Sequence, residues 1–256
     1  MKILRILILF GGLAILALAF GFVLRIPLAL SIWPGQDGRY SYLFIGSILA
    51  AVSAAAIWIG WTGEVGALPA GSLNIFVIAL TSALYFFNLA AQGSSSLVLF
   101  AVISLFMAFV SAVTFFWSRR LPLLDTRPTP MPVRVSFGIF IAALLLAGGA
   151  LVLRQQIFPW DLNPDSSIIF GCIFLGDAFY FLYGLLRPNW GNACGQLLSF
   201  LAYDLVLIVP FVLLINTVKP GHMLGLIVYI AVLVYSSGLA IYYLFIHPQT
   251  RFGSAR

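Results

Sequence analysis

The chain has 256 residues, of which 62% are apolar and 8% are charged. An ordinary soluble domain carries about 25% charged residues, so the 13 basic and seven acidic side chains are too few to cover a globule of this size. The composition excludes a soluble enzyme, a disordered protein, a coiled coil and a disulfide-rich secreted domain. The apolar residues suffice for about eight membrane spans, because one spanning helix needs roughly 20 of them.

Eight apolar stretches of spanning length follow one another along the chain. They cover about residues 6–28, 41–61, 72–91, 97–117, 134–153, 166–186, 196–216 and 223–245. These runs lack the strict alternation of outer-membrane strands, so we expect helices. The predicted fold class is an all-α, multi-pass integral membrane protein with about eight transmembrane helices.

The first stretch has a second interpretation. Lys2 and Arg5 precede an apolar run and the small-residue sequence Ala17–Leu18–Ala19, as in a cleaved signal peptide. The apolar residues continue past this point to Leu30. We therefore expect an uncleaved first span, whereas cleavage would leave seven spans and move the N-terminus to the other side.

The basic residues predict the orientation. Most of them lie on the side of the predicted spans where the N-terminus lies, namely Lys2, Arg5, Arg119, Arg120, Arg127, Arg134, Arg187, Arg251 and Arg256. The other side holds Arg25, Arg39, Arg154 and Lys219. The positive-inside rule then places both termini in the cytoplasm, and we expect the plasma (inner) membrane of a prokaryote.

The net charge of +6 does not indicate nucleic-acid binding, because the basic residues are scattered over several loops. Their densest cluster surrounds residues 121–133, which contain four prolines and should form an extended cytoplasmic linker. The arginines of this cluster either set the topology and contact lipid headgroups or form a docking site for a cytoplasmic partner.

The two halves of the chain share a sequence pattern. In each half a Leu–Arg pair ends a span, a loop with an aromatic residue and proline follows, and the next span opens with serine and a nearby glycine. The matched positions are Leu24–Arg25, Trp33–Pro34 and Ser41–Gly46 in the first half, and Leu153–Arg154, Phe158–Trp160 and Ser167–Gly171 in the second. Each half holds four spans, so we predict two parallel four-helix repeats, residues 1–120 and 134–256. Chance resemblance between apolar helices is the alternative.

Two acidic residues lie inside spans. Asp177, in the sixth span, and Asp204, in the seventh, fall near the predicted midplane, with Tyr180 and Tyr203 as expected neighbours. An ionisable group at that depth is costly and is a functional hypothesis by default. One interpretation is a proton or cation pathway, and the other is structural, with neutral carboxyls hydrogen-bonded across helices.

A third interpretation, intramembrane aspartyl proteolysis, is not adopted. Gly176–Asp177 and Tyr203–Asp204 are faintly similar to the two motifs of that class of protease. However, Phe174 stands where the first motif requires glycine, and the two motifs occur in reverse order.

The two aromatic–Pro loops are the most distinctive repeated feature. Their candidate residues are Trp33, Pro34, Pro159 and Trp160. They are interpreted either as paired elements that cover an outer vestibule or as interfacial anchors beside rigid turns.

Other patterns mainly exclude functions. His222 and His247 fall at helix ends on opposite sides, which excludes a bis-His haem inside the bundle and disfavours a His-rich metal site. Neither lysine lies in mid-span, so no Schiff-base residue is available. We expect no cofactor, no metal and no catalytic residue; a non-enzyme is favoured, and the question is left open.

The sequence therefore predicts a non-catalytic membrane protein, a subunit or scaffold of a membrane complex. The alternative is a small proton- or cation-coupled permease that uses Asp177 and Asp204. The expected partners are the lipid bilayer and either other membrane subunits or further copies of the chain, with no nucleic acid.

Overall fold

The structure is a computed structural model that describes residues 2–253. These residues form helices and no strands, and eight of the helices are long and apolar enough to cross a membrane. The predicted all-α, multi-pass fold is thus confirmed, and the chain is an integral membrane protein. The long helices are α1 (Lys2–Val23), α3 (Arg39–Thr62), α4 (Leu68–Ala91), α5 (Val98–Ser118), α6 (Met131–Val152), α7 (Pro164–Leu186), α8 (Trp190–Leu214) and α9 (Met223–Ile241).

Shorter helical segments complete the long helices. The short helix α2 (Pro27–Leu30) follows α1, and the 3-10 turns are η1 (Val65–Ala67), η2 (Ser95–Leu97) and η3 (Pro220–His222). A π-helical segment, η4 (Tyr242–Ile246), continues α9.

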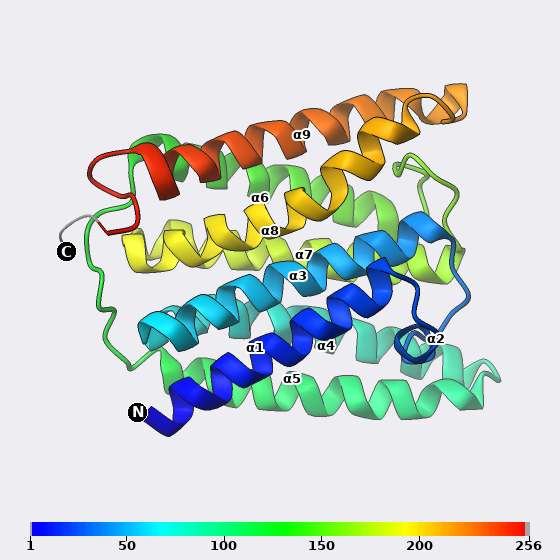
Figure 1. Ribbon diagram of the computed structural model, residues 1–256. Coiled ribbons are helices and arrows are strands. Elements are labelled where there is room, and N and C mark those ends of the chain that lie inside the picture. The colour runs from blue at the N-terminus through cyan, green and yellow to red at the C-terminus, as the bar shows by residue number, and fades with distance from the viewer. Residues whose placement is uncertain (1, 254–256) are drawn as a thin grey trace.

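The long helices form two layers of four (Figure 1). In one layer α1 packs on α3, α3 on α8 and α8 on α9; in the other α5 packs on α4, α4 on α7 and α7 on α6. Each half of the chain therefore supplies one helix pair to each layer, and the centre of each layer joins one helix from each half. This pairing is compatible with the parallel repeat of residues 1–120 and 134–256, which stays a prediction.

Glycines allow the close packing within the layers. A Cβ atom on Gly60 of α3 would lie 2.8 Å from the backbone nitrogen of Leu9 in α1. A Cβ atom on Gly176 of α7 would lie 2.8 Å from the carbonyl oxygen of Asn74 in α4. Small residues at such positions let helix backbones approach each other, which is a main source of helix association in lipid.

Aromatic side chains fill the space between the layers. Phe44 of α3 is fully buried, and its ring centroid lies 4.6 Å from that of Phe170 and 5.6 Å from that of Phe174, both on α7. Phe158 and Tyr203 also pack against Phe44. This cluster joins one layer to the other near the end of the bundle where α3 and α7 begin.

Several helix boundaries differ from the prediction. Helix α1 ends at Val23 rather than near residue 28, because Arg25 adopts a left-handed conformation with φ of 57° that ends the helix. Arg154 has φ of 58° just after α6, so both halves use the arginine of the matched Leu–Arg pair in this way. Helix α6 begins at Met131, three residues before the predicted start of the span at residue 134, because its first turn tolerates Pro132.

The start of α1, the end of η4 and the proline-rich linker lie at one end of the bundle, and α2 lies at the other (Figure 1). We call the first the inner end and the second the outer end. Which end faces the cytoplasm stays a prediction.

Candidate functional site

The two aspartates within spans have separate partners. The amide of Asn74 in α4 donates to Oδ1 of Asp177 in α7 at 2.6 Å. This hydrogen bond lies one residue from the close approach at Gly176 and fastens the two helices at the centre of their layer. Asp177 remains partly exposed at the surface of the protein.

Asp204 of α8 is fully buried. Its Oδ2 accepts hydrogen bonds from the hydroxyls of Ser236 at 2.8 Å and Ser237 at 3.0 Å, both on α9. Its Oδ1 has no hydrogen-bond partner among the described residues. Asp204 thus joins α8 to α9 in the other layer and keeps one acceptor position unfilled.

Tyrosine hydroxyls lie near both carboxyl groups. The hydroxyl of Tyr203 forms a hydrogen bond with that of Tyr229 on α9. Both aspartates lie within electrostatic range of these two hydroxyls. The predicted neighbour Tyr180 bonds instead to Ser199 of α8 at 3.3 Å.

Within the part of the chain that the structure describes, Asp177 and Asp204 form no ion pair and share no hydrogen-bond partner. Their expected action as a pair stays a prediction. Sequence reasoning missed Asn74 as a partner, although a polar amide inside an apolar span was a signal that could have found it. It also did not identify Ser236 and Ser237 of α9 as partners of Asp204.

At the outer end, each aromatic–Pro loop contacts the half of the chain to which it does not belong. In the first loop, Asp37 accepts hydrogen bonds from Nε1 of Trp33 at 2.6 Å and from the hydroxyl of Ser166 in the first turn of α7 at 2.5 Å. In the second loop, Nε1 of Trp160 donates to the hydroxyl of Ser41 in the first turn of α3 at 3.1 Å. Each loop is thus bonded to the first turn of a helix from the other half.

The second loop is part of the protein core. Pro159 and Trp160 are buried, and the indole of Trp160 stacks on Phe158 with ring centroids 4.5 Å apart. Trp33 and Pro34 line a small cavity of about 60 Å³ at the outer end. Whether these loops cover a vestibule or anchor the protein at the interface stays a prediction.

The proline-rich linker is fixed against the inner end of the bundle. The buried carboxylate of Glu64 accepts hydrogen bonds from the backbone N–H groups of Leu124 at 2.6 Å and Asp125 at 3.1 Å. The linker also bonds to the turn between α7 and α8, where the N–H of Trp190 donates to the carbonyl of Arg127 at 2.7 Å. The segment between α5 and α6 thus lies outside the helices and is bonded to both halves of the chain; its role as a linker between repeats stays a prediction.

An ion pair lies within the linker. A guanidinium nitrogen of Arg127 lies 2.6 Å from a carboxylate oxygen of Asp125, and the hydrogen bonds to that carboxylate raise the pKa of Arg127. Another nitrogen of Arg127 donates to the carbonyl of Gln249 at 2.5 Å. The linker is thereby bonded to the segment that follows η4.

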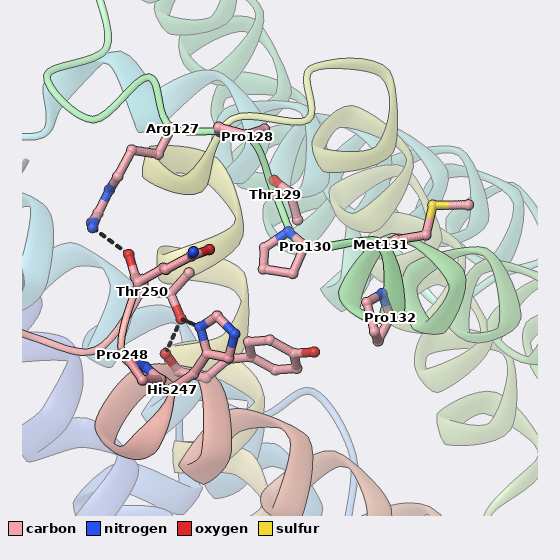
Figure 2. Close-up of a pocket in the computed structure, with 11 residues that line it drawn as sticks. Arg127, Pro128, Thr129, Pro130, Met131, Pro132, His247, Pro248 and Thr250 are labelled. Carbon is pink, nitrogen blue, oxygen red and sulfur yellow. Dashed lines mark hydrogen bonds between the residues drawn. The ribbon is translucent and has the colours of Figure 1, made fainter.

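A cavity with a volume of about 870 Å³ lies beside this contact (Figure 2). Its walls come from residues 127–132 of the linker and the start of α6, from Tyr243 of η4 and from residues 247–250 of the loop after it. The hydroxyl of Thr129, which lines it, is buried and has no hydrogen-bond partner among the described residues.

No protein-family profile, no curated protein and no solved structure matches the chain. In the described residues, no group of three or more His, Cys, Asp or Glu side chains is placed to hold a metal ion. Function is therefore inferred from the geometry of the residues themselves.

Proposed function

We propose that this protein is a non-catalytic subunit or scaffold of a membrane complex. The observation that carries the proposal is that each aspartate within a span forms hydrogen bonds to a neighbouring helix. Asp177 of α7 bonds to Asn74 of α4. Asp204 of α8 bonds to Ser236 and Ser237 of α9. Hydrogen bonds of this kind stabilise helix association in lipid by about 0.6 kcal/mol on average, and by up to about 1.7 kcal/mol.

The fixed linker supports a docking role. A segment that Glu64 holds by two backbone hydrogen bonds has little ordering entropy left to lose when a partner binds. The basic residues Arg119, Arg120 and Arg134 flank it at the inner end. The positive-inside rule assigns this end, with both termini, to the cytoplasm of a prokaryotic plasma membrane.

The test compares Asn and Leu substitutions at Asp177 and Asp204. If the carboxyls only fasten helices, Asp→Asn at either position keeps a hydrogen-bonding oxygen and leaves thermal stability in detergent close to that of the wild type. Asp→Leu removes the hydrogen bond and lowers stability. Purification of the wild-type protein in mild detergent should then yield a stoichiometric membrane partner or a defined homo-oligomer. A lone monomer would contradict the subunit role.

A proton- or cation-coupled permease is the second candidate. It is favoured by the unfilled Oδ1 of the buried Asp204 and by the hydrogen-bonded Tyr203–Tyr229 pair on the same two helices. Asp204, Tyr203 and Tyr229 lie on α8 and α9 in one layer, and Asp177 lies on α7 in the other.

Proteoliposomes with an internal pH dye separate the two candidates. A permease requires that wild-type protein dissipate an imposed pH or cation gradient and that Asp204→Asn abolish this flux while folding normally. Asp161→Asn, in an outer loop, is the matched control and should keep the flux. Absence of flux in the wild type under both gradients removes the permease and leaves the structural role.

A further inference from the structure

At the outer end, the start of α9 lies against the second aromatic–Pro loop (Figure 1). A Cβ atom on Gly225, in the first turn of α9, would lie 2.8 Å from the carbonyl oxygen of Ile157, just before the loop. His222, the last residue of η3, contacts the carbonyl of Phe158 in the same place. Because Phe158 packs on Phe44 in the cluster between the layers, the contacts of His222 connect the start of α9 to the core of the bundle.

Each nitrogen of the His222 ring faces an oxygen that accepts hydrogen bonds and has no proton to donate. Nδ1 lies 3.1 Å from the carbonyl oxygen of Phe158, and Nε2 lies 3.3 Å from Oδ1 of Asp161. A neutral imidazole has one N–H donor and one acceptor nitrogen, whereas the imidazolium has two donors. The protonated ring therefore satisfies both contacts, and a neutral ring sets a lone pair against one of the two oxygens.

Asp161 is a carboxylate throughout the pH range in which histidine titrates. Its Oδ2 accepts a hydrogen bond from Lys219, the residue before η3, and this hydrogen bond lowers the pKa of Asp161. The backbone N–H of His222 donates to the carbonyl of Lys219 at 2.9 Å and fixes the turn that carries both basic side chains. One carboxylate of the loop thus contacts two residues of the turn, one through each oxygen.

The other titratable groups on the surrounding elements have partners of their own. They are Tyr229, bonded to Tyr203, Tyr40, packed on Trp160, and Arg154, paired with Asp165. Within the part of the chain that the structure describes, His222 and Lys219 each form their ion pair with Asp161. The charge on His222 therefore acts mainly on one carboxylate, that of Asp161.

We propose that His222 is a pH switch at the outer end, which fastens the start of α9 to the second aromatic–Pro loop when its ring is protonated. Imidazole titrates near pH 6.5, so both contacts form in an acidic medium at that end. As the pH rises, the ring keeps the hydrogen bond from Nδ1 to Phe158 and loses its attraction to Asp161. The Asp161 side chain is 68% exposed, so it can then turn toward solvent with Lys219. This switch is independent of whether the protein is a subunit or a permease.

The protonation of the ring is tested by NMR of the full-length protein in detergent with ¹⁵N-labelled histidine. The chain has two histidines, and loss of one signal set in His247→Gln assigns the other to His222. At about pH 5.5, below the ordinary imidazole range, we expect both ring nitrogens of His222 to carry protons. At about pH 8 we expect a proton on Nδ1 and none on Nε2. A neutral ring with its proton on Nε2, or a ring whose signals do not change between the two pH values, overturns the proposal.

Thermal unfolding tests the fastening. The contact to Asp161 stabilises the fold below the imidazole range and is lost as the pH rises through it, so the wild type should unfold about 2 °C higher at the acidic pH than at the basic one. His222→Gln removes the titrating ring and should remove this difference, whereas the matched control His247→Gln should keep it.

Asp161→Asn supplies an exposed second variant. Its amide can donate to the neutral Nε2, so the difference in unfolding temperature should disappear there as well. If His222→Gln does not fold, the full wild-type difference in a folded Asp161→Asn contradicts the switch. A wild type that unfolds at the same temperature at both pH values also overturns it.

Discussion

The hydrogen bond between Asn74 and Asp177 allows a quantitative test by a double-mutant cycle. Its donor–acceptor distance is 2.6 Å, and the neighbouring Gly176 holds α7 against α4, so both side chains are positioned before they bond. Interhelical hydrogen bonds in lipid average about 0.6 kcal/mol and reach about 1.7 kcal/mol. For a short bond between pre-positioned groups we predict a coupling free energy of about 1–1.7 kcal/mol.

The cycle uses Asn74→Leu, Asp177→Leu and the double variant, with the free energy of unfolding measured in lipid bicelles. Each single variant leaves one polar group without its partner, and this adds a desolvation cost to the lost bond. The double variant contains neither polar group, so its loss of unfolding free energy should be smaller than the sum of the losses in the two single variants.

A control cycle pairs Asn74→Leu with Ser237→Ala, two residues without a shared partner. Their effects should add to within about 0.5 kcal/mol. If the Asn74–Asp177 cycle is additive to the same degree, the carboxyl does not fasten α7 to α4, and the structural role of Asp177 is refuted.

The remaining predictions concern packing and pH. Gly60→Ala places a Cβ atom 2.8 Å from the backbone nitrogen of Leu9 and should lower the free energy of unfolding by about 1–3 kcal/mol. The control Gly238→Ala has open space around it and should change the free energy of unfolding by less than about 0.5 kcal/mol. Equal effects of the two variants would contradict the close packing of α1 on α3. The hydrogen bond from Lys219 lowers the pKa of Asp161, so their contact should be complete above about pH 4, the ordinary carboxyl range, and should be lost as the pH falls through the lowered pKa. A carboxyl NMR titration checks this, and an Asp161 signal that titrates at or above the ordinary value would contradict the contact.

The number and type of the elements follow from composition, because each span must satisfy its own backbone in lipid and must be apolar over its length. The helix ends are less predictable. Helix α8 begins at Trp190, six residues before the predicted start, and its first turns bury Asn192 and Gln196 against protein rather than lipid. A hydropathy pattern cannot identify such a turn, since residues that contact protein need not be apolar.

The candidate site was predictable only in part. Asp177 and Asp204 stand out because a charge inside a span is rare. Their partners depend on the rotation of α4 and α9 about their axes, and helices that are apolar on all sides carry no periodic signal for that rotation. Asn74 therefore emerged only from the packing of α4 on α7.

The two-layer arrangement also constrains the order of assembly during synthesis. Close packing in the first half is confined to the hairpins α1–α3 and α4–α5, which lie in different layers. The central partners of these hairpins, α8 for α3 and α7 for α4, are the seventh and sixth of the eight long helices to be made. The membrane must therefore hold two separate hairpins until the ribosome has completed most of the chain. Any factor that slows the second half prolongs a state in which the faces of α3 and α4 are open to other proteins.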